Sequence, residues 1–520
     1  MPYDAVIDEP LLELGDIQGN IVPGFKKDHQ HFLFFRIEDM GAARKWLVAL
    51  GPRLSSATEV LEAHQLWKAM RKRLGREPEN IQFVFLNAAL SASGLRQLTS
   101  EQDVKLFADS AFKLGMKERS EFLGDPSAAE AEGHVDQWLV GGTHKPVDLM
   151  LTVASDDRDW LLEVEHGLIR ESSEHGLKLV HRDYGRVQAG KLAGHEHFGF
   201  KDGVSDPAIR GRWATQPDRY VSPRSLPPDP TFDTLRADFA APGQPLVWPG
   251  HFLFGHARQE LDNPQVPRPT DKPRGPAWAE NGAFLVYRRL RQHVEGFEDF
   301  LSRTVKSLKE KFPRLELDEH RLGALLVGRW KSGTPVMRSP DKDAMMDGAA
   351  ANYFRFSNAT QLPIPGDTAM LNPADPNGEV CPLGAHIRKV NPRDDATDLG
   401  PGRRTLAKLI IRRGITYDGR VDRSPESPDD RGLLFVSYQS SIESQFEFLM
   451  RDWVNRSERP RSNGGHDPIL AQGPDRYVNL LINGQQERIS LPGNWVVPTG
   501  GEYFFSPSIQ FFEKTLAQVA

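Results

Sequence analysis

One acidic side chain, Asp202, lies in a segment whose neighbours restrict the backbone. It stands between Gly199 and Gly203, and Pro207 follows shortly after. Glycine permits backbone angles closed to other residues, and proline disfavours helix in the residue before it. We therefore predict a tight loop that holds the Asp202 carboxylate in a fixed place, where it can move a proton. An ordinary glycine–aspartate turn is the alternative interpretation.

The pattern Gly-x-x-Asp-Gly formed by these residues resembles the signature of the dye-decolorizing peroxidases, haem enzymes in which this Asp lies over the distal face of the iron. The resemblance implies one haem b per chain, a proximal histidine, a carboxylate behind it and a distal arginine. It also implies an activity: hydrogen peroxide is reduced through a ferryl intermediate, and bulky aromatic, phenolic or dye-like compounds are oxidised. Asp202 would then be the acid–base residue and the arginine a fixed cation.

A second segment, Cys-Pro-Leu-Gly-Ala-His-Ile-Arg-Lys-Val-Asn-Pro-Arg, resembles the proximal stretch of the same family. The resemblance implies that its histidine, His386, is the axial ligand of the haem iron. We expect the small residues Gly384 and Ala385 to let a flat macrocycle approach the backbone. Arg388 and Arg393 are cations that could pair with haem propionates, although only one of them need do so.

The distal arginine is expected in Leu-Ile-Ile-Arg-Arg-Gly-Ile-Thr-Tyr, which contains two adjacent candidates, Arg412 and Arg413. Successive side chains of a strand point to opposite faces of a sheet, so only one of the two can reach the haem. The family pattern selects Arg412. The chain departs from that pattern with Thr416 and Asp418, where the family commonly has proline and glycine.

Further residues are expected around the haem. Leu433 and Phe435 are two apart on the next predicted strand and would form an apolar roof over a peroxide pocket, or pack as plain core. Gly-Gly-His-Asp-Pro-Ile-Leu resembles the family segment that carries the carboxylate behind the proximal histidine, which implies that role for Asp467. His466 is a competing ligand candidate. Arg329 lies in Val-Gly-Arg-Trp, which resembles a stretch of the longer family members and implies a propionate contact.

Bulky reductants cannot enter a pocket sized for peroxide, so electrons would pass through a haem edge or an oxidisable surface side chain. Trp453 and Tyr417 match positions where the family uses such radicals, and core or rim packing is the equal alternative. Two other classes stay open. A haem-binding or iron-releasing protein of the same fold would need no matched distal acid and cation, and a haem-free interaction module would bind no haem.

The elements that must position these residues follow a repeated order of strand, helix, strand, strand, helix, strand, with a helical insertion between the second and third strands of the first half. In the first half we expect His31–Ile37, Met40–Leu50, Ile81–Leu86, Val147–Val153, Asp156–Arg170 and Leu177–His181. In the second half we expect Ala283–Arg288, Val294–Lys309, Leu406–Arg412, Gly432–Tyr438, Ile442–Val454 and Tyr503–Phe505.

This order predicts an α+β fold of two ferredoxin-like domains of the dimeric α+β barrel type. The expected divisions are an N-terminal domain (1–212), a connector rich in proline and glycine (213–280) and a C-terminal haem-binding domain (281–520). Two half-sheets that face each other would leave a cavity at their junction, so we expect the haem in the C-terminal half near that junction.

Composition limits the class of protein. The 520 residues are 39% hydrophobic and 26% charged, which is typical of a globular protein rather than a disordered one. A net charge of −6 makes nucleic acid or an anionic membrane an unlikely main partner, and a homo-oligomer stays open. The single cysteine, Cys381, excludes an internal disulfide and fits a reducing compartment. The first twenty residues lack a secretory pattern, so a cytoplasmic location is expected.

Overall fold

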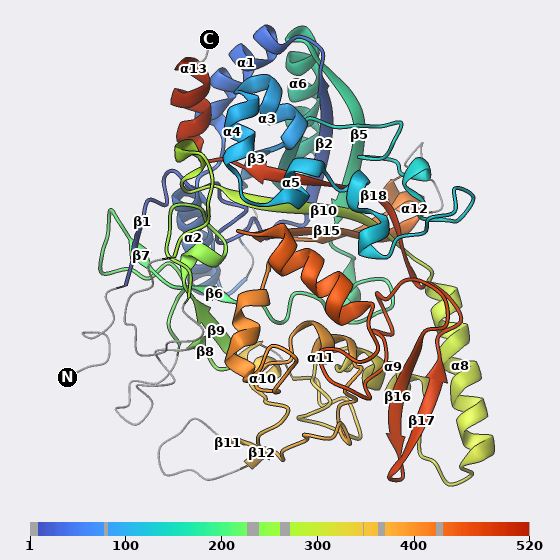
Figure 1. Ribbon diagram of the computed structural model, residues 1–520. Helices are drawn as coiled ribbons and strands as arrows, with labels where there is room; N and C mark the ends of the chain where they lie inside the picture. The colour runs from blue at the N-terminus through green and yellow to red at the C-terminus, as the bar shows by residue number, and fades with distance from the viewer. Residues whose placement is uncertain are drawn as a thin grey trace.

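The computed structural model describes residues 9–76, 78, 82–225, 239–259, 271–346, 348–361, 370–422 and 430–518. Its largest feature is a nine-stranded antiparallel sheet to which both halves of the chain contribute (Figure 1). The N-terminal helices α1, α3 and α6 gather at the top of this view, and α8, α9 and α11 lie below strands β10 and β15. None of the described helices is long and apolar enough to span a bilayer.

The first half has the predicted order. Its elements are β2 (His29–Ile37), α1 (Met40–Leu50), α2 (Ala57–Leu74), β3 (Val84–Ser91), α3 (Ala92–Leu98), β4 (Leu149–Ser155), α6 (Arg158–Glu174) and β5 (Leu177–Arg186). In space the strands lie in the order β3-β4-β2-β5, as a ferredoxin-like unit requires. The expected start of one strand at Ile81 lies outside the described residues.

The second half repeats the order with longer insertions. Its elements are β10 (Ala283–Gln292), α8 (Val294–Lys311), β13 (Ile411–Arg412), β14 (Ile415–Asp418), β15 (Arg431–Gln439), the π-helical turns η11 (Ile442–Glu447) and η12 (Leu449–Val454), and β18 (Val496–Ser506). The insertions contain α9 (Glu319–Val327), α11 (His386–Val390) and the hairpin of β16 (Tyr477–Ile482) and β17 (Gln485–Ser490). They pack on one face of the sheet.

One predicted strand, Leu406–Arg412, is mostly wrong. Residues Gly402–Lys408 form a 3-10 helix, in which Thr405 donates its hydroxyl to the Gly402 carbonyl at 2.7 Å. Only Ile411–Arg412 pairs with β15, and β14 pairs with the same strand after a break at Gly414. The apolar run therefore predicted a strand where local side-chain hydrogen bonds favour a turn.

The two half-sheets join edge to edge. Strand β18 pairs antiparallel with β3, with Phe504 opposite Ser91 and Phe505 opposite Leu90. At the other side of the molecule β14 lies against β5, where the Thr416 hydroxyl donates to the Arg186 carbonyl at 2.5 Å. The sheet therefore closes on itself, and the predicted α+β barrel of two ferredoxin-like halves is confirmed.

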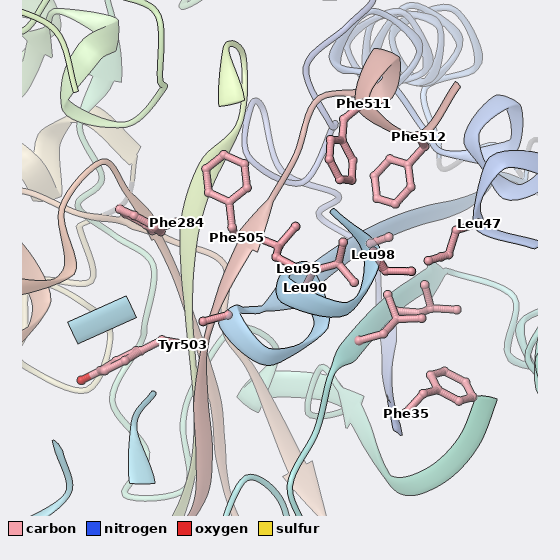
Figure 2. Close-up of a cluster of buried hydrophobic side chains, with 14 of the residues drawn as sticks. Phe35, Leu47, Leu90, Leu95, Leu98, Phe284, Tyr503, Phe505, Phe511 and Phe512 are labelled. Atoms are coloured by element: carbon pink, nitrogen blue, oxygen red, sulfur yellow. The ribbon is translucent and has the colours of Figure 1, made fainter. Parts of the chain in front are cut away.

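Alternate side chains of each strand face the two sides of this barrel. On β2, Phe32 and Phe34 point into the interior core, and Leu33 and Phe35 point outward against the helices. Figure 2 shows the outer cluster, in which Phe35 of the first half and Phe505 of the second half belong to one continuous core. The barrel interior is filled with side chains. The cavity therefore does not lie between the two sheet faces, but on the outer face of the C-terminal half-sheet, where residues 196–207 from the end of the N-terminal domain also line it.

A buried ion cluster also connects the two halves. Arg289 on β10 donates to Asp183 on β5 at 3.0 Å and to Asp430, next to β15, at 2.5 Å. Their side chains are at most 5% exposed. Tyr287 donates to the second oxygen of Asp183 at 2.5 Å. Arg289 is the cation that the two buried carboxylates share, while Asp430 also pairs with Arg291 and Asp183 with His181.

We therefore expect Arg289→Met to lower the free energy of unfolding by about 3–5 kcal/mol, because it removes the fully buried cation that Asp183 and Asp430 share. The midpoint of urea unfolding measures this. Arg291→Met is the matched control, since Arg291 pairs with the same Asp430 but is 36% exposed. Equal midpoint shifts in both variants would show that the buried cluster is not the stabilising feature.

Candidate active site

A cavity lies on the outer face of the C-terminal half-sheet. Strands β10, β13 and β15 form its floor, and η11, η12, α11 and the loop from residue 196 to 207 enclose it. Most of its wall is apolar, from Leu290, Leu433, Phe435, Phe446, Leu449, Met450, Val454, Ile469, Leu470 and Val496. The polar side chains gathered in it include Asp202, Arg412, His386, Arg329 and Arg393. Sequence alone predicted all five.

Asp202 lies on the tight loop that its flanking glycines predict. Gly199 and Gly203 have φ angles of 88° and 68°, a region that residues with a side chain rarely adopt. The Asp202 carboxylate accepts the Gly203 N–H at 2.6 Å and the Arg412 guanidinium at 2.8 Å through the same oxygen. The loop therefore fixes the carboxylate against the strand that carries the arginine.

Arg412 extends from β13 into the cavity. It donates to Asp202 and to the Ser205 carbonyl, the latter at 3.1 Å. Burial by itself would raise the pKa of Asp202, but the charge of Arg412 and the Gly203 N–H outweigh it, so that pKa is lowered. The side chains of Asp202 and Arg412 are 39% and 32% exposed, and this exposed surface faces the cavity. Asp202 is therefore an ionised carboxylate at neutral pH.

Arg413 points to the opposite face of the strand. It donates to the Asn20 carbonyl at 3.0 Å and to Asp206 at 3.2 Å, and it does not line the cavity. As the sequence predicts, the two side chains point to opposite faces of the strand, with Arg412 toward the cavity and Arg413 away from it. Asp206 lies between them, since the Arg412 guanidinium is also 3.5 Å from it.

His386 is the first residue of α11, on the side of the cavity away from the sheet. Its Nδ1 is 2.8 Å from Asp467, which leaves Nε2 to a ligand in the cavity. Burial lowers the pKa of His386, but Asp467 outweighs burial and the net shift is upward. Asp467 is fully buried, and its other oxygen accepts the N–H groups of Ile469 and Leu470. The carboxylate is thus held behind the imidazole.

The small residues before His386 have a different use from the expected one. A Cβ atom on Gly384 would lie 2.2 Å from the carbonyl oxygen of Gly464, in the segment that carries Asp467. Ala385 is fully buried in a separate core cluster. Neither lines the cavity, so the expectation that they admit a macrocycle is wrong. Gly384 instead lets the histidine segment and the Asp467 segment touch.

A buried lysine ties the same two segments together. Lys389, one turn after His386, is 1% exposed, and its ammonium donates to the carbonyls of Gly465, Arg456 and Arg459 at 2.7, 2.9 and 2.5 Å. Burial lowers the pKa of Lys389 to about 8. Its three donors are therefore all used to hold the segment that carries Asp467.

Two cations that line the cavity form no ion pair with a carboxylate among the described residues. Arg329 donates to the carbonyls of Gly333 and Ala351, and Arg393 donates to Asn352 among other neutral oxygens. Within the described part of the chain neither donates to a carboxylate. Burial and repulsion from Arg412 lower the pKa of Arg329 to about 10, and burial and repulsion from Arg329 lower that of Arg393 to about 9. Such a pair fits the two propionates of a haem.

Arg388, the other predicted propionate partner, does not reach the cavity. It is 1% exposed and donates to Asp395 at 2.7 Å and to Asp375 at 3.0 Å. Its remaining donors go to the carbonyls of Cys381 and Asp375. The expectation for Arg388 is therefore wrong, because internal carboxylates already use its charge.

The aromatic residues expected at the surface are buried. Trp453 has no exposed surface and donates its ring N–H to Asp398 at 3.0 Å. Tyr417 is 4% exposed and faces the barrel interior, with the Arg289 guanidinium 4.2 Å from its ring centre. Neither lines the cavity, and neither is the oxidisable surface side chain that the sequence predicts. His466 also lies outside the cavity, so the competing ligand candidate is not supported.

Among the polar residues of the cavity wall that sequence analysis missed are Glu196 and Gln292. The Glu196 carboxylate accepts the N–H groups of Phe198 and Phe200, both at 2.8 Å, and the side-chain amide of Gln292. The sequence signal for Glu196 was an acidic residue six positions before Asp202 on a loop already singled out. Gln292 had no such sequence signal, because only the folded sheet brings the end of β10 next to this loop.

Two family models match the chain. The DyP dimeric alpha+beta barrel domain covers residues 16–188, and the C-terminal domain of Dyp-type peroxidases covers residues 260–462. Dye-decolorizing peroxidase msp1 of Mycetinis scorodonius is 31% identical over 97% of this chain and 88% of its own length. The chain belongs to the dye-decolorizing peroxidase family.

Solved structures agree with this family membership. An ancestral D-type dye-decolorizing peroxidase matches 97% of this chain and 99% of its own, with 30% identity and a TM-score of 0.72. A dye-decolorizing peroxidase in complex with 2,6-dimethoxyphenol matches 98% and 100%, with 28% identity and a TM-score of 0.71. A deferrochelatase of Yersinia pestis is 30% identical, but over only 33% of this chain and 27% of its own.

The close approach of Gly384 to Gly464 generates a prediction. Gly384→Ala should lower the free energy of unfolding by about 1–3 kcal/mol, because its methyl group has no room against the Gly464 carbonyl. Thermal unfolding measures this. Gly167→Ala is the control, since Gly167 lies inside helix α6 with open space around it. This substitution should raise the free energy of unfolding by about 0.5–1 kcal/mol. If Gly384→Ala left the thermal unfolding unchanged, the segments that carry His386 and Asp467 would tolerate separation.

Proposed function

We propose that this peroxidase binds one haem b in the cavity, with His386 as the axial ligand, Asp202 as the acid–base residue and Arg412 as the distal cation. Membership of the dye-decolorizing peroxidase family makes the chain an oxidoreductase that uses peroxide. The observation that carries the assignment of residues is that His386, backed by Asp467, and the pair of Asp202 and Arg412 face one cavity from opposite sides.

The residues of the cavity fit a haem. Arg329 and Arg393, which pair with no carboxylate in the described part of the chain, supply two cations for propionates, and the apolar wall suits the rest of the macrocycle. Bound haem supplies an iron that takes peroxide and holds oxidising equivalents. Asp467 makes His386 a stronger ligand, because a carboxylate that accepts from the far ring nitrogen increases the basicity of the imidazole.

The distal residues perform the proton transfer. Cleavage of the peroxide bond needs a proton moved from the inner oxygen to the outer one, while negative charge develops on the departing oxygen. The ionised Asp202 accepts the first proton and returns it. Arg412 stabilises the developing charge and keeps Asp202 ionised before the reaction. Leu433 and Phe435 keep the remaining space apolar.

The strongest alternative is a haem-binding or iron-releasing protein without peroxidase turnover. The partial match to a deferrochelatase belongs to this alternative. A carrier does not need a carboxylate held by a guanidinium in its haem cavity, so the pair of Asp202 and Arg412 favours the peroxidase. Haem loading alone does not separate the two, whereas reaction with peroxide does.

The reductant we propose is a phenol or another aromatic compound, by analogy with the relative that binds 2,6-dimethoxyphenol. Trp453 and Tyr417 remain proposed electron carriers, now as buried ones.

We also propose the division into residues 1–212, 213–280 and 281–520, and a homo-oligomer consistent with the name of the matched N-terminal domain. A cytoplasmic location is proposed on the single, buried Cys381.

The test of the proposed function is an absorption spectrum of purified, haem-loaded protein before and after addition of hydrogen peroxide. We expect a Soret band that shifts within the mixing time. Asp202→Asn keeps the shape but not the basicity, so it should slow this step about 10²- to 10⁴-fold at unchanged haem content. A spectrum that does not respond to peroxide would favour the carrier, and an unaffected Asp202→Asn would place the base elsewhere.

The two adjacent arginines give a second test. Arg412→Leu should slow the peroxide reaction about 10²- to 10³-fold, because it removes a preorganised charge. It should also move the acid limb of the pH–rate profile upward, since burial raises the pKa of Asp202 and the largest opposing interaction, the charge of Arg412, is then lost. Arg413→Leu, the matched control on the other face, should mainly reduce stability. The reverse ranking would contradict the assignment.

A further inference from the structure

We infer that Glu196 is a positioning residue: its carboxylate fastens the loop that carries Asp202 to strand β10, and so sets where Asp202 stands in the cavity. This inference rests on the proposed function. Glu196 is not itself placed at the reacting atoms, because its two oxygens are already occupied. It acts through the loop geometry that it holds.

The first part of the argument is the bonding of the carboxylate. One oxygen of Glu196 accepts the Phe200 N–H at 2.8 Å, and the other accepts the Phe198 N–H at 2.8 Å. The backbone repeats this closure, since the Glu196 N–H donates to the Phe200 carbonyl at 3.0 Å and the Gly199 N–H to the Glu196 carbonyl at 2.9 Å. The side chain therefore folds the loop directly before Asp202 around itself.

The second part is the attachment of this folded loop to the sheet. The side-chain amide of Gln292, at the end of β10, donates to Glu196 and accepts the His197 N–H at 3.3 Å. His197 in turn contacts the Tyr417 carbonyl of β14 at 2.9 Å. Phe198 packs on Phe297 of α8 with ring centres 4.7 Å apart. Glu196 thus provides the side-chain attachment of the loop to β10, and the His197 N–H reinforces it through the same Gln292 amide.

The third part is charge. Burial and the nearby Asp202 raise the pKa of Glu196 to about 7, and the Gln292, Phe198 and Phe200 donors limit the rise. The charged and titratable groups on the same loop are His195, His197, Lys201 and Asp202. From other elements, Lys331 lies beside Gly199 and Arg412 pairs with Asp202. Asp418, Arg420 and Arg431 act on His197. Protonated Glu196 accepts fewer hydrogen bonds, so the loop is held best above neutral pH.

The experiment compares haem-loaded wild type with Glu196→Gln. The amide has one acceptor oxygen in place of two, so one of the Phe198 and Phe200 N–H groups loses its partner. We expect the peroxide reaction, followed by stopped flow from pH 5 to 9, to slow about tenfold. The wild-type rate should fall as the pH drops through 7, and the variant should lack this inflection.

Hydrogen exchange of the 196–203 segment supplies a readout besides activity. It should accelerate roughly five- to tenfold in Glu196→Gln, the factor that corresponds to one lost hydrogen bond. Gln292→Leu should give part of both effects, because it detaches the loop from β10 but leaves the two backbone contacts.

Glu502→Gln is the matched control. The Glu502 carboxylate also accepts two backbone N–H groups, from Met116 at 2.9 Å and Tyr503 at 2.8 Å, and burial raises its pKa to about 7, but it does not line the cavity. It should change neither the rate nor the pH profile. Equal effects of the two substitutions, or no change in Glu196→Gln, would overturn the inference. A wild-type protein that does not react with peroxide would defeat the proposed function instead, and the exchange measurement would still test the loop.

Discussion

The ion pair between Asp202 and Arg412 is the interaction on which the arrangement of the cavity depends. It joins a loop that leaves the N-terminal half to a strand 210 residues later. Neither charge is stable in such a place alone, because removing an ion from water without a partner is costly. The glycines around Asp202, the Ser205 carbonyl and the alternation on β13 all serve to bring the two groups to 2.8 Å.

The other buried cations differ in whether carboxylates of the protein neutralise their charge. Arg388 and Arg289 are each held between two carboxylates, so they serve the fold. Arg329 and Arg393 contact only neutral oxygens among the described residues, and Arg393 does so from a left-handed backbone with a φ of 55°. A buried charge that the protein leaves uncompensated, on a backbone rarely adopted, indicates a ligand of opposite charge.

Sequence reasoning succeeded where a short local pattern determines the outcome. The Gly-x-x-Asp-Gly loop and the alternation of Arg412 and Arg413 are set by neighbours in the chain or by strand geometry. The pairing of Asp467 with His386, 81 residues apart, was expected only from the family resemblance. Sequence reasoning failed where contacts with residues farther along the chain determine what a side chain does. Nothing near Arg388 in the chain shows that Asp375 reaches it from thirteen residues away, and Gly384 is explained only by Gly464. The cavity was expected at the junction of two facing half-sheets, but inward-facing side chains such as Phe32, Phe34 and Tyr287 fill the space between them.

The pairing of β18 with β3 has a consequence for synthesis of the protein. Until residues 496–506 leave the ribosome, β3 remains an open sheet edge, with unpaired backbone groups and apolar side chains such as Leu90 beside it. Edges of this kind recruit other strands and promote aggregation. The N-terminal half is therefore exposed to misassembly throughout translation of the second half. Premature termination before β18 would yield a chain prone to association, with its first domain otherwise complete.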